Sequence, residues 1–552
     1  MVLIFMKINK VLSSILTMCL VSTSFFSILQ VSAKTTEEQD SLKTEQSSMF
    51  ARTPIKKNQY TINSKSDFHS FMKSSLLQIS DYEIILACDI DMEGETCKPI
   101  EEFSGKFDGC GHKISNLKVQ DSHKLFKKFE MAFIKTLDSF SEIKNVTFDN
   151  YIVNDKGSSA ILPSSYKSAE LVLTNYGTIS GVNIINGKIF NINNTNKSGD
   201  AAGFVLNNEE CGVIKNCSTE ISYEKSKINA GFVYENSGEI TDSFTAVLVN
   251  SEDNAGGFVN KNFGTIKNSK STGNVNGFSC VGGFAANNFE TGIISDNCVA
   301  TGIAIGQEYV GGFCGNNKGI ILDSRSEGDG KATTISTTMV CGGFVGINSK
   351  DIINCTSSGF GISSARTAGA AKAKAGGFIG ENNGGSIMSC TAAKGGYATS
   401  FSGNVFAGGF VGDNKKGKIT NCTAKGVTKA MSGLGQAKAG GFAGINKASI
   451  MSSKASGNVY LSAGIFYKDN GCGGFVGKND QDGSIDGCYA EAMVETTNKK
   501  KGGGFVGESE NNSEIKNSTC ESKVVLKKGK TKKAEFCYDK SKKAVIENCT
   551  AN

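Results

Sequence analysis

One short phrase returns about every thirty residues and constrains the fold of this chain more than any other feature. A clear copy reads AGGFVGDN at 407–414 and continues as GKITNCTA at 417–424. Its phenylalanine recurs along the chain at Phe204, Phe232, Phe258, Phe284, Phe313, Phe344, Phe378, Phe410, Phe442, Phe475 and Phe505, with a looser copy at Phe536. Self-similarity at such a period is the signature of a solenoid, in which each repeat contributes one turn.

The second half of the phrase predicts the local geometry of each turn. An isoleucine such as Ile419 is followed two residues later by Asn, Asp, Ser or Gly, and then by Cys or Ser. Residues of the first group accept a left-handed backbone or bond their own backbone, so the column of Asn421 is predicted to be a corner. The isoleucine should end one strand and the Cys or Ser should start the next, with both side chains facing inward. One copy, Ile294–Cys298, carries an extra residue, which predicts a bulge or a widened corner.

A single turn of this kind cannot bury its own inner face, but stacked turns can. The sequence therefore predicts an all-β fold, a parallel β-helix that is right-handed and has about 15 rungs. Its first corners are expected at Ile114–Leu117, Ile143–Val146 and Ile179–Val182. The phenylalanine column should form an interior aromatic stack. The glycine pair before each phenylalanine should mark a tight turn or a close approach of backbones.

The first 33 residues have the features of a secretory signal peptide. Lys7 and Lys10 precede an apolar stretch, and small residues end the segment at Ala33, where we expect cleavage. No later apolar run is long enough to span a membrane, so no transmembrane segment is expected in the mature chain. These features predict a secreted or cell-surface location.

Four regions follow from this pattern: the signal peptide at 1–33, a flexible lead-in at 34–57, an N-terminal cap with the first rungs at 58–200, and the repeat β-helix at 201–552. A short helix over Ser66–Gln78 is predicted to cap the first rung. Its N-cap would be Ser66, and its apolar face is expected to comprise Phe68, Phe71, Met72 and Leu76.

The charge pattern bears on possible partners. The formal net charge of +6 falls to +4 when the leader and its two lysines are removed. The remaining basic residues are mostly lysines scattered among acidic residues, which is typical of a solvated surface, so nucleic acid is not an expected partner.

The chain has eighteen cysteines, a number that in a secreted protein usually indicates disulfides. Cys19 lies in the leader, and seven others occupy the repeat column: Cys217, Cys298, Cys355, Cys390, Cys422, Cys488 and Cys549. Stacked residues keep their parallel Cβ atoms about 4.8 Å apart, whereas a disulfide needs about 3.8 Å. Together with the interchange of Cys and Ser, this spacing predicts reduced, buried thiols. The spacing of the column cysteines does not match that of the ligands in a metal site either. Cys88, Cys97 and Cys110 lie outside the column and could pair.

The motif Ala-Gly-Gly-Phe-Val-Gly-x-Asn with Gly-x-Ile-x-Asn-Cys-Thr-Ala resembles the GLUG repeat of secreted bacterial proteins, over about residues 60–552. This resemblance implies a parallel β-helix in a secreted or surface-exposed protein. Some relatives resemble adhesins, and some carry the repeat beside an immunoglobulin-A1-cleaving metallopeptidase domain. Such a peptidase needs His-Glu-x-x-His, but the histidines here, His69, His112 and His123, stand alone. The protease role therefore does not carry over, and no catalytic, cofactor-binding or metal-binding residue is predicted.

Two functions remain open. The first is a non-catalytic adhesion, binding or structural role, in which the solenoid presents its surface to a host or cell-surface protein or glycan. The contact regions would be the inserts Gly361–Ala375, Ala393–Ala407 and Lys425–Ala439, which are longer than turn closure requires. The alternative is a carbohydrate-active enzyme, a polysaccharide lyase or hydrolase, with carboxylates on adjacent rungs. Asp242 and Asp323 are the acids of the corner column, and they are not on neighbouring rungs.

The final rung, 545–552, would expose unpaired backbone at the edge of the solenoid. End-to-end self-association is therefore a further expectation.

Overall fold

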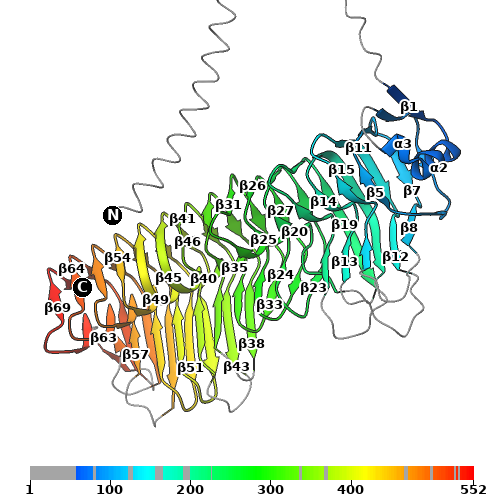
Figure 1. The fold of residues 1–552 in the computed structure, drawn as a ribbon. Helices are drawn as coiled ribbons and strands as arrows, with labels where there is room; N and C mark the ends of the chain where they lie inside the picture. The colour runs from blue at the N-terminus through cyan, green and yellow to red at the C-terminus, as the bar shows by residue number, and fades with distance from the viewer. Residues whose placement is uncertain are drawn as a thin grey trace, which may run out of the picture. The chain divides into compact units, whose positions relative to one another are not determined.

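The computed structural model describes residues 58–78, 82–121, 129–155, 166–190, 199–224, 227–334, 338–365, 371–464, 470–497, 502–526, 530–532 and 535–552. The predicted signal peptide and lead-in, residues 1–57, lie outside the described residues. Residues 58–552 form one compact unit (Figure 1).

The unit is a parallel β-solenoid of about 13 turns, which confirms the predicted fold class. A turn in the regular part contains β48 (Val405–Gly408), β49 (Val411–Thr420), β50 (Thr423–Ala424) and β51 (Thr428–Ser432). β49 pairs in parallel with β45 (Ile379–Met388) on one side and with β53 (Ala443–Asn446) and β54 (Ser449–Met451) on the other. The register places Ile387, Ile419 and Ile450 directly above one another, as the repeat predicted.

The phenylalanine column forms the predicted aromatic stack. From Phe204 to Phe505 every ring of the column is fully buried. Neighbouring ring centroids, including that of Phe536, are 4.6–4.9 Å apart. The spacing equals the distance between strands, so the rings stack because the turns stack. Before each ring the backbones nearly touch: a Cβ on Gly409 would lie 2.0 Å from the carbonyl oxygen of Gly441. Only glycine fits there, as predicted.

The predicted corner column is also present. Asn421 has φ 54°, and its equivalents, whether Asn, Asp, Ser or Gly, all have positive φ values of similar size. The copy with the extra residue has two such residues in succession, Asp296 and Asn297, which confirms the widened corner.

The corner explains why Cys and Ser interchange in the next column. Cys390 is buried, and its Sγ donates a hydrogen bond to the carbonyl of Met388 and accepts one from the backbone N–H of Cys355 in the preceding turn. The hydroxyl of Ser453 makes the same two contacts, with Met451 and Cys422. Each side chain therefore satisfies a corner amide, a role that the prediction of buried thiols did not include. All 17 cysteines among the described residues are free.

A buried ladder of asparagines runs beside the phenylalanines. The side-chain amide of each one donates to the side-chain oxygen of the next, at 2.7–3.0 Å. Its members are Asn175, Asn208, Asn236, Asn262, Asn288, Asn317, Asn348, Asn382, Asn414, Asn446 and Asn479. An amide has both donors and an acceptor, so an endless column of identical residues can satisfy itself inside an apolar core.

A helical cap covers the N-terminal end, with differences from the prediction. α2 (Lys65–Lys73) begins at Ser64, whose side chain caps the amide of Asp67, rather than at Ser66. The ring of Phe71 in α2 packs on the rings of Phe103 and Phe107 of the first turns. The chain becomes extended at Ser74, so α3 (Ser75–Gln78) turns away and leaves Leu76 69% exposed, not buried.

Two other features of the first turns were not anticipated. A strand before the helix, β1 (Asn58–Ile62), pairs in parallel with β2 (Tyr82–Leu86). The corner after Ile114 belongs to a different column from the one expected, because Ile114 pairs with Phe148 instead of Ile143. The position that pairs with Ile143 is held by Phe107.

The described parts of the three inserts contain strands. Where described, they form additional stacked strands, such as β43 (Gly361–Ala365), β47 (Gly396–Ser400) and β51 in one sheet, and β44 (Ala373–Gly376), β48 and β52 (Ala437–Gly440) in another. Their small residues suit strands that pack closely. In the last turn the equivalents of core residues, Phe536, Ile546 and Cys549, are partly exposed. No helix within the described ranges is long and apolar enough to cross a membrane.

Candidate functional site

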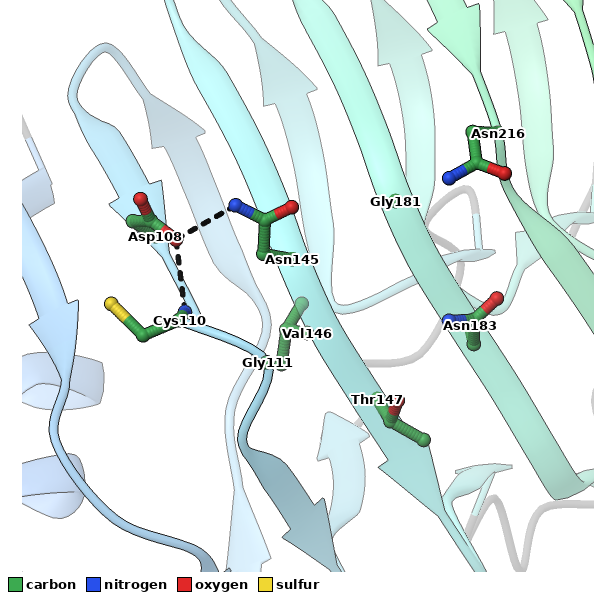
Figure 2. Close-up of a pocket in the computed structure, with 9 residues that line it drawn as sticks. All are labelled: Asp108, Cys110, Gly111, Asn145, Val146, Thr147, Gly181, Asn183 and Asn216. Carbon is green, nitrogen blue, oxygen red and sulfur yellow. Dashed lines mark hydrogen bonds between the residues drawn. The ribbon is translucent and has the colours of Figure 1, made fainter.

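A shallow groove lies on the outer surface of the early turns and encloses about 540 Å³. Nine residues line it (Figure 2): Asp108, Cys110, Gly111, Asn145, Val146, Thr147, Gly181, Asn183 and Asn216. Most of these side chains are polar and uncharged.

The groove follows from the corner column and from one missing side chain. Asn145, Gly181 and Asn216 occupy the corner in three successive turns, with φ values of 53°, 61° and 52°. Gly181 leaves a gap between the amides of the other two (Figure 2). A Cβ built on Gly181 would lie 3.1 Å from Oδ1 of Asn145, so a side chain here would enter the hollow.

One end of the groove holds a fixed negative charge. Asp108 accepts hydrogen bonds from the backbone N–H of Cys110 at 2.9 Å and from the amide of Asn145 at 3.2 Å. Partial burial opposes ionisation of Asp108, but these two bonds and the nearby Lys144 outweigh it and hold the pKa of the carboxyl below its ordinary value. Asp108 is therefore a hydrogen-bond acceptor at neutral pH and not a proton donor.

The remaining groups offer neutral hydrogen bonds. Oδ1 of Asn183 accepts from the hydroxyl of Ser218 at 2.7 Å, which fixes the orientation of its amide. Within the described part of the chain, the side-chain amide of Asn216 has no hydrogen-bond partner. Amides that both donate and accept are suited to the hydroxyl groups of a ligand.

Two of the residues that line the groove carry groups of the kind used in catalysis, the carboxylate of Asp108 and the thiol of Cys110. Asp108 is the single carboxylate among its lining residues, whereas glycosidases use two. Cys110 is an exposed residue. Partial desolvation of its sulfur and the charge of Asp108 raise the pKa of its thiol. A thiol that stays protonated is a poor nucleophile.

The three histidines and the two corner acids weighed from the sequence are not among the residues that line this groove. His69 contacts Glu95 through Nε2, and its Nδ1 is 3.8 Å from the sulfur of Cys97. His112 bonds Asp89, while His123 is outside the described residues. Asp242 and Asp323 accept hydrogen bonds from Asn268 and Asn354 of the adjacent turns, so they serve the corner.

A second surface feature comes from the predicted contact inserts. Phe401, Met431 and Leu434 are 57%, 48% and 40% exposed. The backbone N–H of Leu434 bonds the carbonyl of Phe401 at 2.7 Å, which places these two side chains on neighbouring turns. Large apolar side chains gathered in solvent are typical of contact surfaces.

Comparison with known proteins adds little to this geometry. No protein-family profile matches the chain, and no curated protein matches it. One solved structure that aligns with it is described as a "putative immunoglobulin A1 protease" from Bacteroides ovatus. The two are 12% identical over 89% of this chain and 84% of the other, with a TM-score of 0.16.

Proposed function

We propose that this is a secreted or cell-surface binding protein without catalytic activity, and that its groove takes an uncharged, hydroxyl-rich ligand such as a glycan. The observation that carries the proposal is the gap at Gly181, which opens a row of corner amides to solvent. Elsewhere the residues of the repeat interact with one another inside the fold: the phenylalanines stack, the asparagines form hydrogen bonds with one another, and the thiols satisfy corner amides.

The alternative, a polysaccharide lyase or hydrolase, is less well supported. A hydrolase needs a second carboxylate beside Asp108, and none lines the groove within the described residues. Turnover of a polysaccharide that is abolished by Asp108→Asn would favour the enzyme over the binding protein.

Substitution of Gly181 by Asn tests the groove directly. Asn occupies the same corner in the neighbouring turns at nearly the same φ, so the fold should tolerate the change while the side chain fills the hollow. Gly487→Asn is the matched control, because Gly487 holds the same column at φ 60° but lies outside the groove. On a glycan array the first variant should lose the signal of the wild type and the control should keep it. Equal binding by both variants would contradict the proposed site.

The exposed apolar residues of the inserts are proposed as a second contact surface, for a host or cell-surface protein. Phe401→Ser with Leu434→Ser should reduce adhesion to cells or matrix without affecting the groove. Unchanged adhesion would remove this surface from the proposal.

Secretion, cleavage after Ala33 and end-to-end self-association belong to the same proposal. Amino-terminal sequencing of the exported protein would locate the cleavage. Light scattering at high concentration tests the association, and a monomeric mass would argue against it.

A further inference from the structure

Three ionisable side chains are buried together between two adjacent turns. Lys374 in β44, Glu381 in β45 and Asp413 in β49 are 6%, 5% and 3% exposed. The Nζ atom of Lys374 contacts Oε2 of Glu381 and lies 2.7 Å from Oδ2 of Asp413. Glu381 and Asp413 pair in register on neighbouring strands, so one lysine reaches the carboxyl groups of two turns.

This cluster is shut off by close packing of the backbone. A Cβ on Gly412 would lie 2.9 Å from the backbone nitrogen of Ala375, and one on Gly380 would lie 2.6 Å from that of Cys341. The two layers that enclose the lysine therefore meet at glycines, which leaves little room for water.

One atom of the cluster has no partner among the residues that the structure describes. Oδ1 of Asp413 is buried and accepts no hydrogen bond from them, although the other oxygen of the same carboxyl contacts Lys374. A buried carboxylate with an unpaired oxygen is costly, and so is a buried charge pair. Amide formation between the two side chains would remove both charges.

We propose that Lys374 and Asp413 become joined by an intramolecular amide bond, with Glu381 transferring the protons. Glu381 takes one proton from the ammonium of Lys374, and the free amine attacks Cγ of Asp413, so that the N–C bond forms. Protons from the nitrogen, carried by Glu381, convert one carboxyl oxygen into water, which leaves as its C–O bond breaks. The ammonium, with three protons on nitrogen, and the carboxylate give one amide N–H and one water, so atoms and charge balance without an oxidant or a further reactant.

The geometry assigns each group a distinct part in this step. Glu381 touches the reacting nitrogen, and its second oxygen is held by Lys415 at 2.6 Å, which fixes the carboxyl in place. Lys374 and Asp413 are 39 residues apart in the chain and belong to consecutive turns. The bond would therefore close one full turn of the solenoid covalently.

Mass spectrometry of the intact, purified protein tests the proposal. The wild type should be lighter than its sequence mass by one water, and a tryptic digest should contain a branched peptide joining Lys374 to Asp413. Glu381→Gln and Lys374→Met should have their full sequence masses. Lys447→Ala is the control and should still lose water, because Lys447 pairs with Asp480 and contacts none of the three groups.

Asp413→Asn gives the sharpest result. Attack on the carboxamide releases ammonia instead of water, so the product should have the same mass as the joined wild type. A wild type of full sequence mass, with separate tryptic peptides, would show that the cluster is an ion pair only and would overturn the proposal. This readout needs no variant to fold. Retention of the bond in Glu381→Gln would overturn the role of Glu381.

Discussion

The aromatic stack gives the most direct test of how this solenoid is held together. Phe344 lies between Phe313 and Phe378, with ring centroids 4.7 Å away on each side. Phe→Ala changes in a core cost about 3–5 kcal/mol through lost burial and the cavity left behind. Each stacked contact contributes about 0.5–1.5 kcal/mol beyond burial. Because Phe344 loses two such contacts, Phe344→Ala should lower the free energy of unfolding by about 5 kcal/mol.

Phe536→Ala is the matched control for this change. Phe536 stacks on Phe505 and is partly exposed, so its loss should cost only about 1–2 kcal/mol. Stability in a solenoid is the sum of turns and nearest-neighbour interfaces, so the effect of Phe344→Ala should stay near its own turn.

Urea unfolding combined with hydrogen exchange of peptides from residues 338–365 would measure both effects. Amide protection should fall in those peptides and in the turns on either side, and stay unchanged around β1. Equal losses for the two variants, or unchanged protection around Phe344, would refute the view that the stack couples the turns.

Three further predictions concern buried polar groups. Glu170 is fully buried, and its two carboxylate oxygens have no partner within the described ranges, so burial raises its pKa well above the ordinary value. The unfolded chain then releases a proton that the folded chain keeps, so stability should fall as pH rises from about 4 toward the folded pKa, and Glu170→Gln should weaken this dependence in thermal unfolding. Asn317→Leu should lower the free energy of unfolding by about 2–5 kcal/mol, because it leaves the amides of Asn288 and Asn348 without their ladder partners; a neutral effect by urea unfolding would contradict this. Thiol titration of the denatured, unreduced protein should find most cysteines free, and in the native protein the exposed Cys211 should react first; mostly blocked thiols would show disulfides instead.

The sequence predicted the repeating part of the structure because each column has one dominant physical cause. The position of Ile419 is buried, the corner at Asn421 has a left-handed backbone, and the neighbouring backbone leaves no space for a side chain at Gly409. These requirements are local or act between identical turns, so the period alone reveals them. The interchange of Cys and Ser was visible too, although its cause, a hydrogen bond to a corner amide, depends on three-dimensional contacts.

The features that the sequence did not predict depend on contacts between residues that are far apart in the chain. Leu76 fits a helical face by spacing, but the chain breaks at Ser74 and turns it into solvent. The asparagine that ends each phrase looked polar and was not assigned to the interior, because a buried amide is stable only if its neighbours are amides as well. The groove arises from the absence of a side chain at Gly181. A glycine in a column that otherwise carries side chains was the available signal, but glycine also suits a plain corner.

The hydrogen bonds of the asparagine ladder all run in one direction. From Asn175 toward Asn479, the side-chain N–H of each asparagine donates to the side-chain oxygen of the asparagine in the following turn. Every asparagine inside the ladder therefore accepts from an asparagine in the preceding turn and donates to one in the following turn. A whole turn could therefore be duplicated or lost between any two links, and the ends would meet partners identical to those they had before. Length is thus a freely adjustable property of this architecture, while the outline of each turn is not.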